Sequence, residues 1–142
     1  MNKIRPWLYI GKYSETRAHL MLKARGISAM LQLAELVEHP GIESCYLAVE
    51  DGLPLPDKIL KQGTDFVIAQ KEQGGTILIA CGAGISRSAA FAIAALKEIE
   101  GLTLLDAFHE VRQARPESLP HMALWASLCQ YYGESIDWLD LI

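Results

Sequence analysis

The feature that most constrains this chain is a short apolar run that leads through a glycine-rich loop into an alanine-rich segment. Residues 76–80 read Thr-Ile-Leu-Ile-Ala, a continuous β-branched stretch typical of a strand buried on both faces. The loop 81–87 follows directly, and a helix is predicted over 88–99. A strand buried on both faces favours a parallel sheet covered by helices, so this segment indicates the α/β class.

The rest of the sequence agrees with that class. Strands are predicted at 7–10, 27–33 and 45–49, and helices at 14–24, 57–73, 103–114 and 120–132. We therefore expect a single domain over residues 1–142, with a central, largely parallel sheet of four to five strands flanked by helices on both faces. Ligands of such sheets bind at the carboxyl ends of strands, which directs attention to the loop after residue 80.

Loop 81–87, here called the cradle, reads Cys-Gly-Ala-Gly-Ile-Ser-Arg and has the composition of an anion-binding site. Its glycines let the backbone curl so that N–H groups point into one cup, to which the following helix adds its positive N-terminal end. Arg87 can make a bidentate contact to a phosphoryl group, and the same positive charge favours a nucleophilic thiolate at Cys81. The predicted phosphate ligands are Gly82, Ala83, Gly84, Ile85, Ser86 and Arg87. The simpler alternative, a core thiol before an ordinary turn, does not explain why these features occur together.

Phosphoryl transfer also needs a general acid for the leaving oxygen. Asp51 follows the predicted strand 45–49 and opens the sequence Asp-Gly-Leu-Pro-Leu-Pro, a loop shaped by glycine and proline. Spacing alone leaves Glu50 and Asp57 as rivals, and a solvated loop carboxylate is the alternative for each of them. We take Asp51 as the candidate acid.

These segments resemble the cysteine-dependent protein phosphatases of the dual-specificity branch. Residues 81–88 resemble the C-x-x-x-x-x-R-S/T motif, residues 4–11 the opening motif, and residues 115–128 the closing helix. Residues 51–56 resemble the general-acid loop of the group that includes the phosphatases of regenerating liver. The resemblance implies a protein tyrosine phosphatase-like fold and a phosphocysteine mechanism that acts on phosphotyrosine and phosphoserine/threonine in proteins.

The resemblance also implies a role for each catalytic candidate. Cys81 is the nucleophile, Arg87 and the loop amides bind the phosphoryl oxygens, and Asp51 acts first as acid and then as base. Ser88 donates a hydrogen bond to the Cys81 sulfur when the sulfur leaves. The mechanism implied in this way uses no metal and no cofactor.

Two positions depart from the family pattern. Ala80 stands where a histidine usually precedes the nucleophile, which predicts that Cys81 ionises less readily than is usual in the family. His121 stands where an asparagine is common; it either supports the loop through a polar contact or is a surface residue at a helix start. Ala80 is also the one feature that favours a phosphate-binding pseudophosphatase as the alternative function. A phosphatase of a small phosphorylated metabolite is the other alternative.

Composition limits the partners. The formal net charge of −4 argues against binding to nucleic acid, and no apolar run approaches the roughly 20 residues of a membrane helix. The start lacks the pattern of a signal peptide, and three isolated cysteines do not form a disulfide framework. We expect a cytoplasmic monomer, with no nucleic acid and no membrane partner, that acts on phosphorylated proteins or peptides.

Three features remain open at this stage. Cys45 is either a resolving thiol that forms a disulfide with Cys81 or, as is more common, a buried strand cysteine. Trp7, Trp125 and Trp138 are interpreted as packing residues rather than ligand platforms. The acidic and apolar tail, residues 134–142, docks either on the domain or on a partner.

Overall fold

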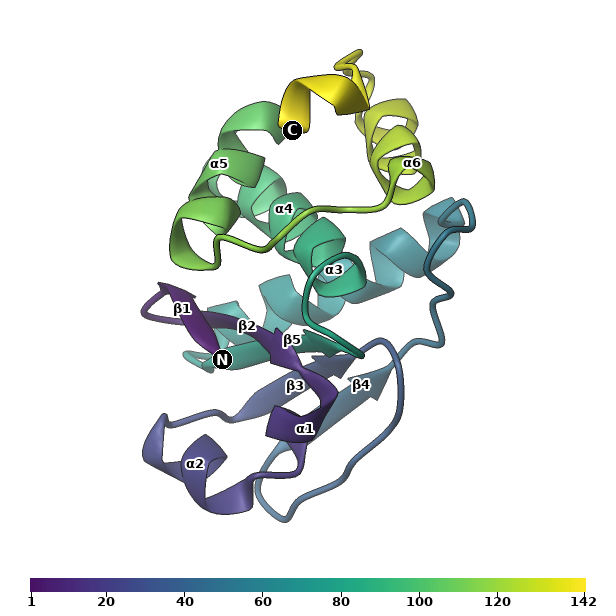
Figure 1. Ribbon diagram of the computed structural model, residues 1–142. Helices are drawn as coiled ribbons and strands as arrows, with labels where there is room; N and C mark the ends of the chain where they lie inside the picture. The colour runs from purple at the N-terminus through teal and green to yellow at the C-terminus, as the bar shows by residue number, and fades with distance from the viewer.

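The computed structural model describes residues 1–142 and is built around one mixed sheet (Figure 1). Its five strands are β1 (Asn2–Arg5), β2 (Leu8–Lys12), β3 (Ala29–Gln32), β4 (Glu43–Tyr46) and β5 (Ile77–Cys81). The spatial order is β1-β2-β5-β3-β4, in which β1 is antiparallel to β2 and all other pairs are parallel. The predicted largely parallel sheet is confirmed, and β5 lies at its centre with every residue buried.

Helices cover both faces of the sheet, as predicted (Figure 1). One face carries the short helices α1 (Tyr13–Thr16) and α2 (His19–Ala24). The other carries α3 (Asp57–Glu72), α4 (Arg87–Glu100), α5 (Leu104–Ala114) and α6 (Met122–Tyr132), which is followed by the 3-10 helix η1 (Trp138–Leu141). None of these helices combines the length and apolar character that crossing a membrane would need.

The alternation of side chains along β5 divides the core in two. Ile77, Ile79 and Cys81 belong to a cluster of 29 buried residues on the side of α3–α6. Leu78 and Ala80 belong to a cluster of six on the side of α2. Because Cys81 is the last residue of the central strand, the nucleophile candidate lies at the carboxyl edge of the sheet, beneath the start of α4.

Helix α4 is the most deeply buried helix, and this fixes the end of the cradle. Every residue from Ser88 to Leu96 is buried, and most of them are alanine, so the helix packs closely against β5 and its neighbouring helices. Gly101 ends it in the left-handed conformation, with φ 71°. Arg87, its first residue, is therefore held on a rigid element.

The structure differs from the sequence prediction at three elements. Strand β1 was not predicted, because only Ile4 of its four residues is buried and the pattern is polar. The predicted helix 14–24 is two helices: Thr16 Oγ1 bonds to Tyr13 O at 2.6 Å, and Ala18 has non-helical angles (φ −86°, ψ 72°). Strand β4 lies at 43–46 rather than 45–49, although the chain continues along β3 beyond it.

Candidate active site

Cys81 and Ser88 meet at the base of the cradle. Cys81 is 2 % exposed, and its Sγ lies 3.2 Å from the hydroxyl of Ser88, a buried residue in the first turn of α4. The thiol donates to Ser88 Oγ in this arrangement. A thiolate has no proton to donate, so the hydroxyl would donate to the sulfur instead. The structure thus brings together the two side chains that the sequence placed seven residues apart.

The loop turns the carbonyl groups of residues 82–85 outward, where all four accept hydrogen bonds. Gly82 O accepts from Tyr13 N–H at 3.3 Å and Ile85 O accepts from Leu119 N–H at 2.9 Å. Arg115 donates to Gly84 O at 2.7 Å and to Ala83 O at 3.3 Å. Because N–H and C=O point in opposite directions across a trans peptide, the N–H groups of residues 83–86 point to the inner side of the loop. The N–H groups of residues 82–86 donate to no protein acceptor, so they are available to bind an anion.

Arg115 is the residue at this site that sequence reasoning missed. It entered only as part of a family motif, yet its side chain is 7 % exposed and holds two carbonyls of a loop 31 and 32 positions away. Its Nη1 also donates to Asn2 Oδ1 at 2.6 Å, which ties strand β1 to the cradle. A side chain on Gly84, at φ 69°, would meet Gly11 O at 2.7 Å and Arg115 Nη2 at 2.8 Å. Glycine is therefore required for this contact.

Arg87 lies between the cradle and the chain that leads to Asp51. Its Nη1 donates to Val49 O at 3.0 Å, and a Cβ on Gly82 would lie 2.9 Å from its Nη2. The guanidinium is therefore folded over the start of the loop, beside the inward-facing amides. The prediction that Arg87 and the loop backbone share one site agrees with this placement.

Asp51 reaches the cradle through a serine. Its Oδ1 accepts a hydrogen bond from Ser86 Oγ at 2.6 Å, and the same hydroxyl accepts from the backbone N–H of His121 at 2.8 Å. Of the two rivals, Glu50 lines the cavity that also contains Asp51 and Arg87, whereas Asp57 lies in the first turn of α3 and lines neither cavity beside the cradle. Asp51 is thus the carboxylate hydrogen-bonded to the loop.

His121 combines the two interpretations that the sequence left open. It is an exposed residue at the start of α6, where its Nδ1 accepts from Ala123 N–H at 3.1 Å and caps the helix. It also supports the loop, but through its backbone N–H to Ser86 rather than through its imidazole.

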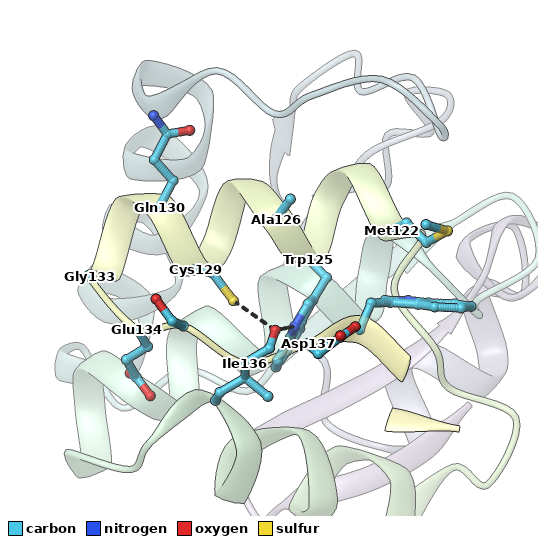
Figure 2. Close-up of a pocket in the computed structure, with 11 residues that line it drawn as sticks. Met122, Trp125, Ala126, Cys129, Gln130, Gly133, Glu134, Ile136 and Asp137 are labelled. Atoms are coloured by element: carbon cyan, nitrogen blue, oxygen red, sulfur yellow. Dashed lines mark hydrogen bonds between the residues drawn. The ribbon is translucent and has the colours of Figure 1, made fainter. Parts of the chain in front are cut away.

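Two cavities open beside the cradle. One of about 420 Å³ is lined by Leu33, Ala34, Tyr46, Ala48, Val49, Glu50, Asp51 and Arg87. The other, of about 240 Å³, is lined by Asp51, Ile85, Ser86, Leu119, Pro120, His121 and Trp138. The largest cavity, about 720 Å³, lies between α6 and the chain that follows it and contains no cradle residue (Figure 2). Cavity size alone would therefore point away from Cys81.

The sheet excludes a disulfide between Cys45 and Cys81, the less common of the two alternatives that the sequence left open. Strand β3 separates them, because Cys45 pairs with Leu31 and Leu31 pairs with Ile79. Two strand spacings place their Cα atoms on the order of 10 Å apart, beyond the roughly 7 Å that a disulfide tolerates. Cys45 is a half-buried strand cysteine, and burial raises the pKa of its thiol.

Comparison with known proteins identifies the family. The family model described as "Dual specificity phosphatase, catalytic domain" matches residues 8–134. Mouse dual specificity protein phosphatase 14 is 28% identical over 131 residues, covering 89% of this chain and 66% of that protein. Human dual specificity protein phosphatase 1 is 31% identical over 138 residues, covering 93% of this chain and 37% of that protein. The chain thus spans less than two thirds of the length of these two relatives.

Solved structures agree with this match. Human DUSP28 superposes with a TM-score of 0.86 at 28% identity, covering 94% of this chain and 96% of that one. Human tyrosine phosphatase-like serine/threonine/tyrosine-interacting protein gives 0.85 at 26% identity, covering 94% and 95%. The narrower resemblance to the phosphatases of regenerating liver stays a prediction. The fold, the cradle and these matches together show that the chain belongs to the dual specificity phosphatase catalytic-domain family.

Proposed function

We propose that residues 1–142 form a cysteine-dependent phosphatase domain that hydrolyses phosphotyrosine and phosphoserine/threonine in proteins through a phosphocysteine intermediate. The observation that carries the proposal is the cradle itself. Its carbonyls are bonded outward, its N–H groups face inward, and Cys81 and Arg87 lie at its two ends. In such an arrangement the hydrogen-bond donors are already oriented before substrate binds, and they stabilise the charge of the phosphoryl group once it is bound.

In the first step the Cys81 thiolate attacks phosphorus while the loop amides and Arg87 bind the non-bridging oxygens. A P–S bond forms and the bond from phosphorus to the substrate oxygen breaks, leaving its electron pair on that oxygen. Protonated Asp51 gives the proton that converts the leaving oxygen to a hydroxyl. Asp51 must exchange its contact with Ser86 for one with the substrate to do so.

In the second step Asp51, now a carboxylate, takes a proton from water as the water oxygen attacks phosphorus. The P–S bond breaks and the sulfur leaves as a thiolate, to which the Ser88 hydroxyl 3.2 Å away can donate. Phosphomonoester and water are converted to alcohol and inorganic phosphate, and both protein side chains return to their starting state.

Hydrolysis of p-nitrophenyl phosphate and of phosphotyrosine and phosphoserine peptides, between about pH 5 and 8 without added metal, tests the proposal. We expect turnover by the wild type and a loss of at least about 10³-fold in Cys81→Ser, because the nucleophile is removed. Turnover that survives in Cys81→Ser, or that appears only with added divalent metal, would contradict the covalent mechanism.

Ala80 supports one other candidate, a pseudophosphatase that binds phosphorylated partners without turnover. If the wild type is silent with all substrates but binds vanadate or phosphate, and Arg87→Met abolishes that binding, this second function replaces the first. Turnover of small phosphorylated metabolites without turnover of phosphopeptides would instead favour a metabolite phosphatase. The rate of Cys81 alkylation against pH, in wild type and Ala80→His, tests whether Ala80 reduces thiolate formation.

The same proposal includes a cytoplasmic location and a monomeric state, with a phosphorylated protein as partner and neither nucleic acid nor membrane. Three free cysteines and a net charge of −4 support it. Size-exclusion chromatography with light scattering measures the mass of the protein in solution. A mass of twice 15.7 kDa would contradict the monomer.

A further inference from the structure

The chain after α6 docks back onto the domain, which answers the question that the sequence left open about the tail. Trp125 Nε1 donates to Ile136 O at 2.9 Å, as Figure 2 shows, and Trp138 Nε1 donates to Pro120 O at 2.8 Å. Arg112 Nη1 donates to Leu141 O at 2.7 Å, and Leu141 is buried. The family match ends at residue 134, so residues 135–142 lie outside the part of the chain that the family model matches.

The docked segment builds one wall of a cavity that opens directly from the cradle. Trp138 lines the cavity of about 240 Å³ together with Ile85, Leu119 and Pro120, and the cavity shares Asp51 and Ser86 with the reacting centre. His121 completes the lining, and no lysine or arginine contributes to it. The cavity on the other side of Asp51 contains Arg87 and Glu50 and is therefore the charged side of the site.

We propose that this cavity is a substrate subsite, which receives an apolar side chain next to the phosphorylated residue, and that Trp138 is the residue that determines this preference. The inference rests on the proposed phosphatase function. A peptide whose phosphoryl group lies in the cradle has to pass Asp51. The cavity beyond it offers aliphatic, proline and aromatic surface, with the polar groups of Ser86 and His121 at its edge.

The geometry supports an apolar occupant for two reasons. The indole of Trp138 is only half-buried, so part of its apolar surface is open to an incoming side chain. The same indole is held by its bond to Pro120 O, so binding does not have to order it.

The test compares two phosphotyrosine peptides that differ only in Leu or Asn at the positions immediately before and after the phosphorylated residue. Leu and Asn have similar size and no charge, so the pair isolates apolar character. We expect the wild type to favour the Leu peptide by about tenfold in kcat/KM, mostly through KM. Trp138→Ala should remove the preference and leave the hydrolysis of p-nitrophenyl phosphate unchanged.

Two matched variants distinguish the effect of the Trp138 ring as a cavity wall from any effect of changing how the tail docks. Trp138→Phe keeps an aromatic wall but lacks the donor to Pro120, and it should keep most of the preference. Leu139→Ala removes a neighbouring side chain that is 63% exposed and lines neither cavity beside the cradle, and it should change nothing. If Trp138→Ala does not fold, the indole N–H resonance of Trp138 in Cys81→Ser should shift on addition of the Leu peptide and not of the Asn peptide.

Equal kcat/KM for the two peptides in the wild type, or a preference that survives in folded Trp138→Ala, would overturn the subsite. Failure of the phosphatase function is distinguishable, because the wild type would then hydrolyse neither peptide nor p-nitrophenyl phosphate. The subsite would still be testable by calorimetry, where the Leu peptide should bind the wild type more tightly than the Asn peptide.

Discussion

The two halves of the candidate active site are held in different ways. The cradle is bonded at successive carbonyls by groups from α1, from the end of α5 and from the loop before α6. The Asp51 segment contacts the cradle through one side-chain bond to Ser86 and through the carbonyl of Val49. The first half is thus fixed before substrate binds, while the second can exchange its contact.

This difference matches the chemistry that the proposed function assigns to each half. Phosphate binding benefits from dipoles that are already oriented, since reorienting them during the reaction would cost free energy. A general acid has to reach a leaving oxygen whose position depends on the substrate, so an exposed carboxylate on a loop suits substrates of different length. The comparison predicts that changes in the two halves will have different kinetic signatures.

The largest effect that we predict is that of Asp51→Asn, in the half that can exchange its contact. It should lower kcat by about 10²- to 10⁴-fold with phenyl phosphate, whose leaving oxygen needs a proton, and by much less with p-nitrophenyl phosphate. Steady-state kinetics with the two esters measure the difference. Glu50→Gln and Asp57→Asn are the matched controls. If kcat with phenyl phosphate falls further in either control than in Asp51→Asn, the residue changed in that control is the general acid.

Arg115→Met should have the next largest effect and should act on the fixed half. Without the bonds to Ala83 and Gly84 the loop amides lose their orientation, so kcat/KM should fall by about 10²-fold with both esters. Vanadate binding should weaken in parallel, which no effect on leaving-group protonation would explain.

Glu117→Gln is the control for Arg115. Glu117 pairs with Arg115 at 3.4 Å but is half-exposed, so its loss should change kcat/KM less than about twofold. If Arg115→Met loses activity with phenyl phosphate alone, the cradle does not depend on these outward bonds.

The local sequence pattern was enough to predict the cradle, but it did not predict the contacts that hold the cradle in place. The strand 77–81, the glycines and the start of α4 are contiguous in sequence, so their geometry follows from local rules. The contact of Arg115 with Gly84 spans 31 positions and joins a side chain to a backbone carbonyl, which no periodicity records. The structure shows that Arg115, a buried arginine just after α5, is the residue that makes this contact.

The same limit explains the errors in the fold. Strand β1 has a polar pattern because it is an edge strand, and its bonds come from β2 rather than from burial. The division between α1 and α2 depends on two residues, Arg17 and Ala18, whose types are compatible with helix. Pairing with β2 accounts for the first outcome, and the bond from Thr16 Oγ1 to Tyr13 O accompanies the second.

Ser86→Ala should have a smaller effect, because it removes one of the two links between the halves and leaves the loop backbone and the Asp51 carboxylate in place. Asp51 loses one bond at an exposed position where water can replace it, so kcat should fall by less than about tenfold.

His121→Ala is the control for Ser86→Ala, since the contact of His121 with Ser86 comes from the backbone N–H. It should leave kcat within about twofold while lowering stability through loss of the α6 cap, by about 1 kcal/mol. A larger loss of kcat in His121→Ala than in Ser86→Ala would assign the imidazole a role of its own.

Arg5→Met should have the smallest effect and tests how strand β1 supports the cradle. Arg5 bonds to Glu100 at 2.8 and 2.9 Å and to Glu110 at 2.7 Å, far from the loop, whereas Asn2 on the same strand bonds to Arg115. Hydrogen bonding from Arg5 lowers the pKa of Glu100 below its usual 4.5. A lowered pKa contributes stability above the unfolded value, and this contribution is lost as the pH falls through the folded pKa.

Denaturant unfolding of Arg5→Met should therefore show a loss of less than about 1 kcal/mol at neutral pH, since both pairs are partly exposed. The gap to the wild type should narrow as the pH falls below about 4.5 and the carboxylates of both proteins become protonated. Activity should be unchanged, because neither Glu100 nor Glu110 contacts the cradle. A loss of kcat/KM close to that of Arg115→Met would show that the whole β1 edge positions the cradle, and not the Asn2–Arg115 bond.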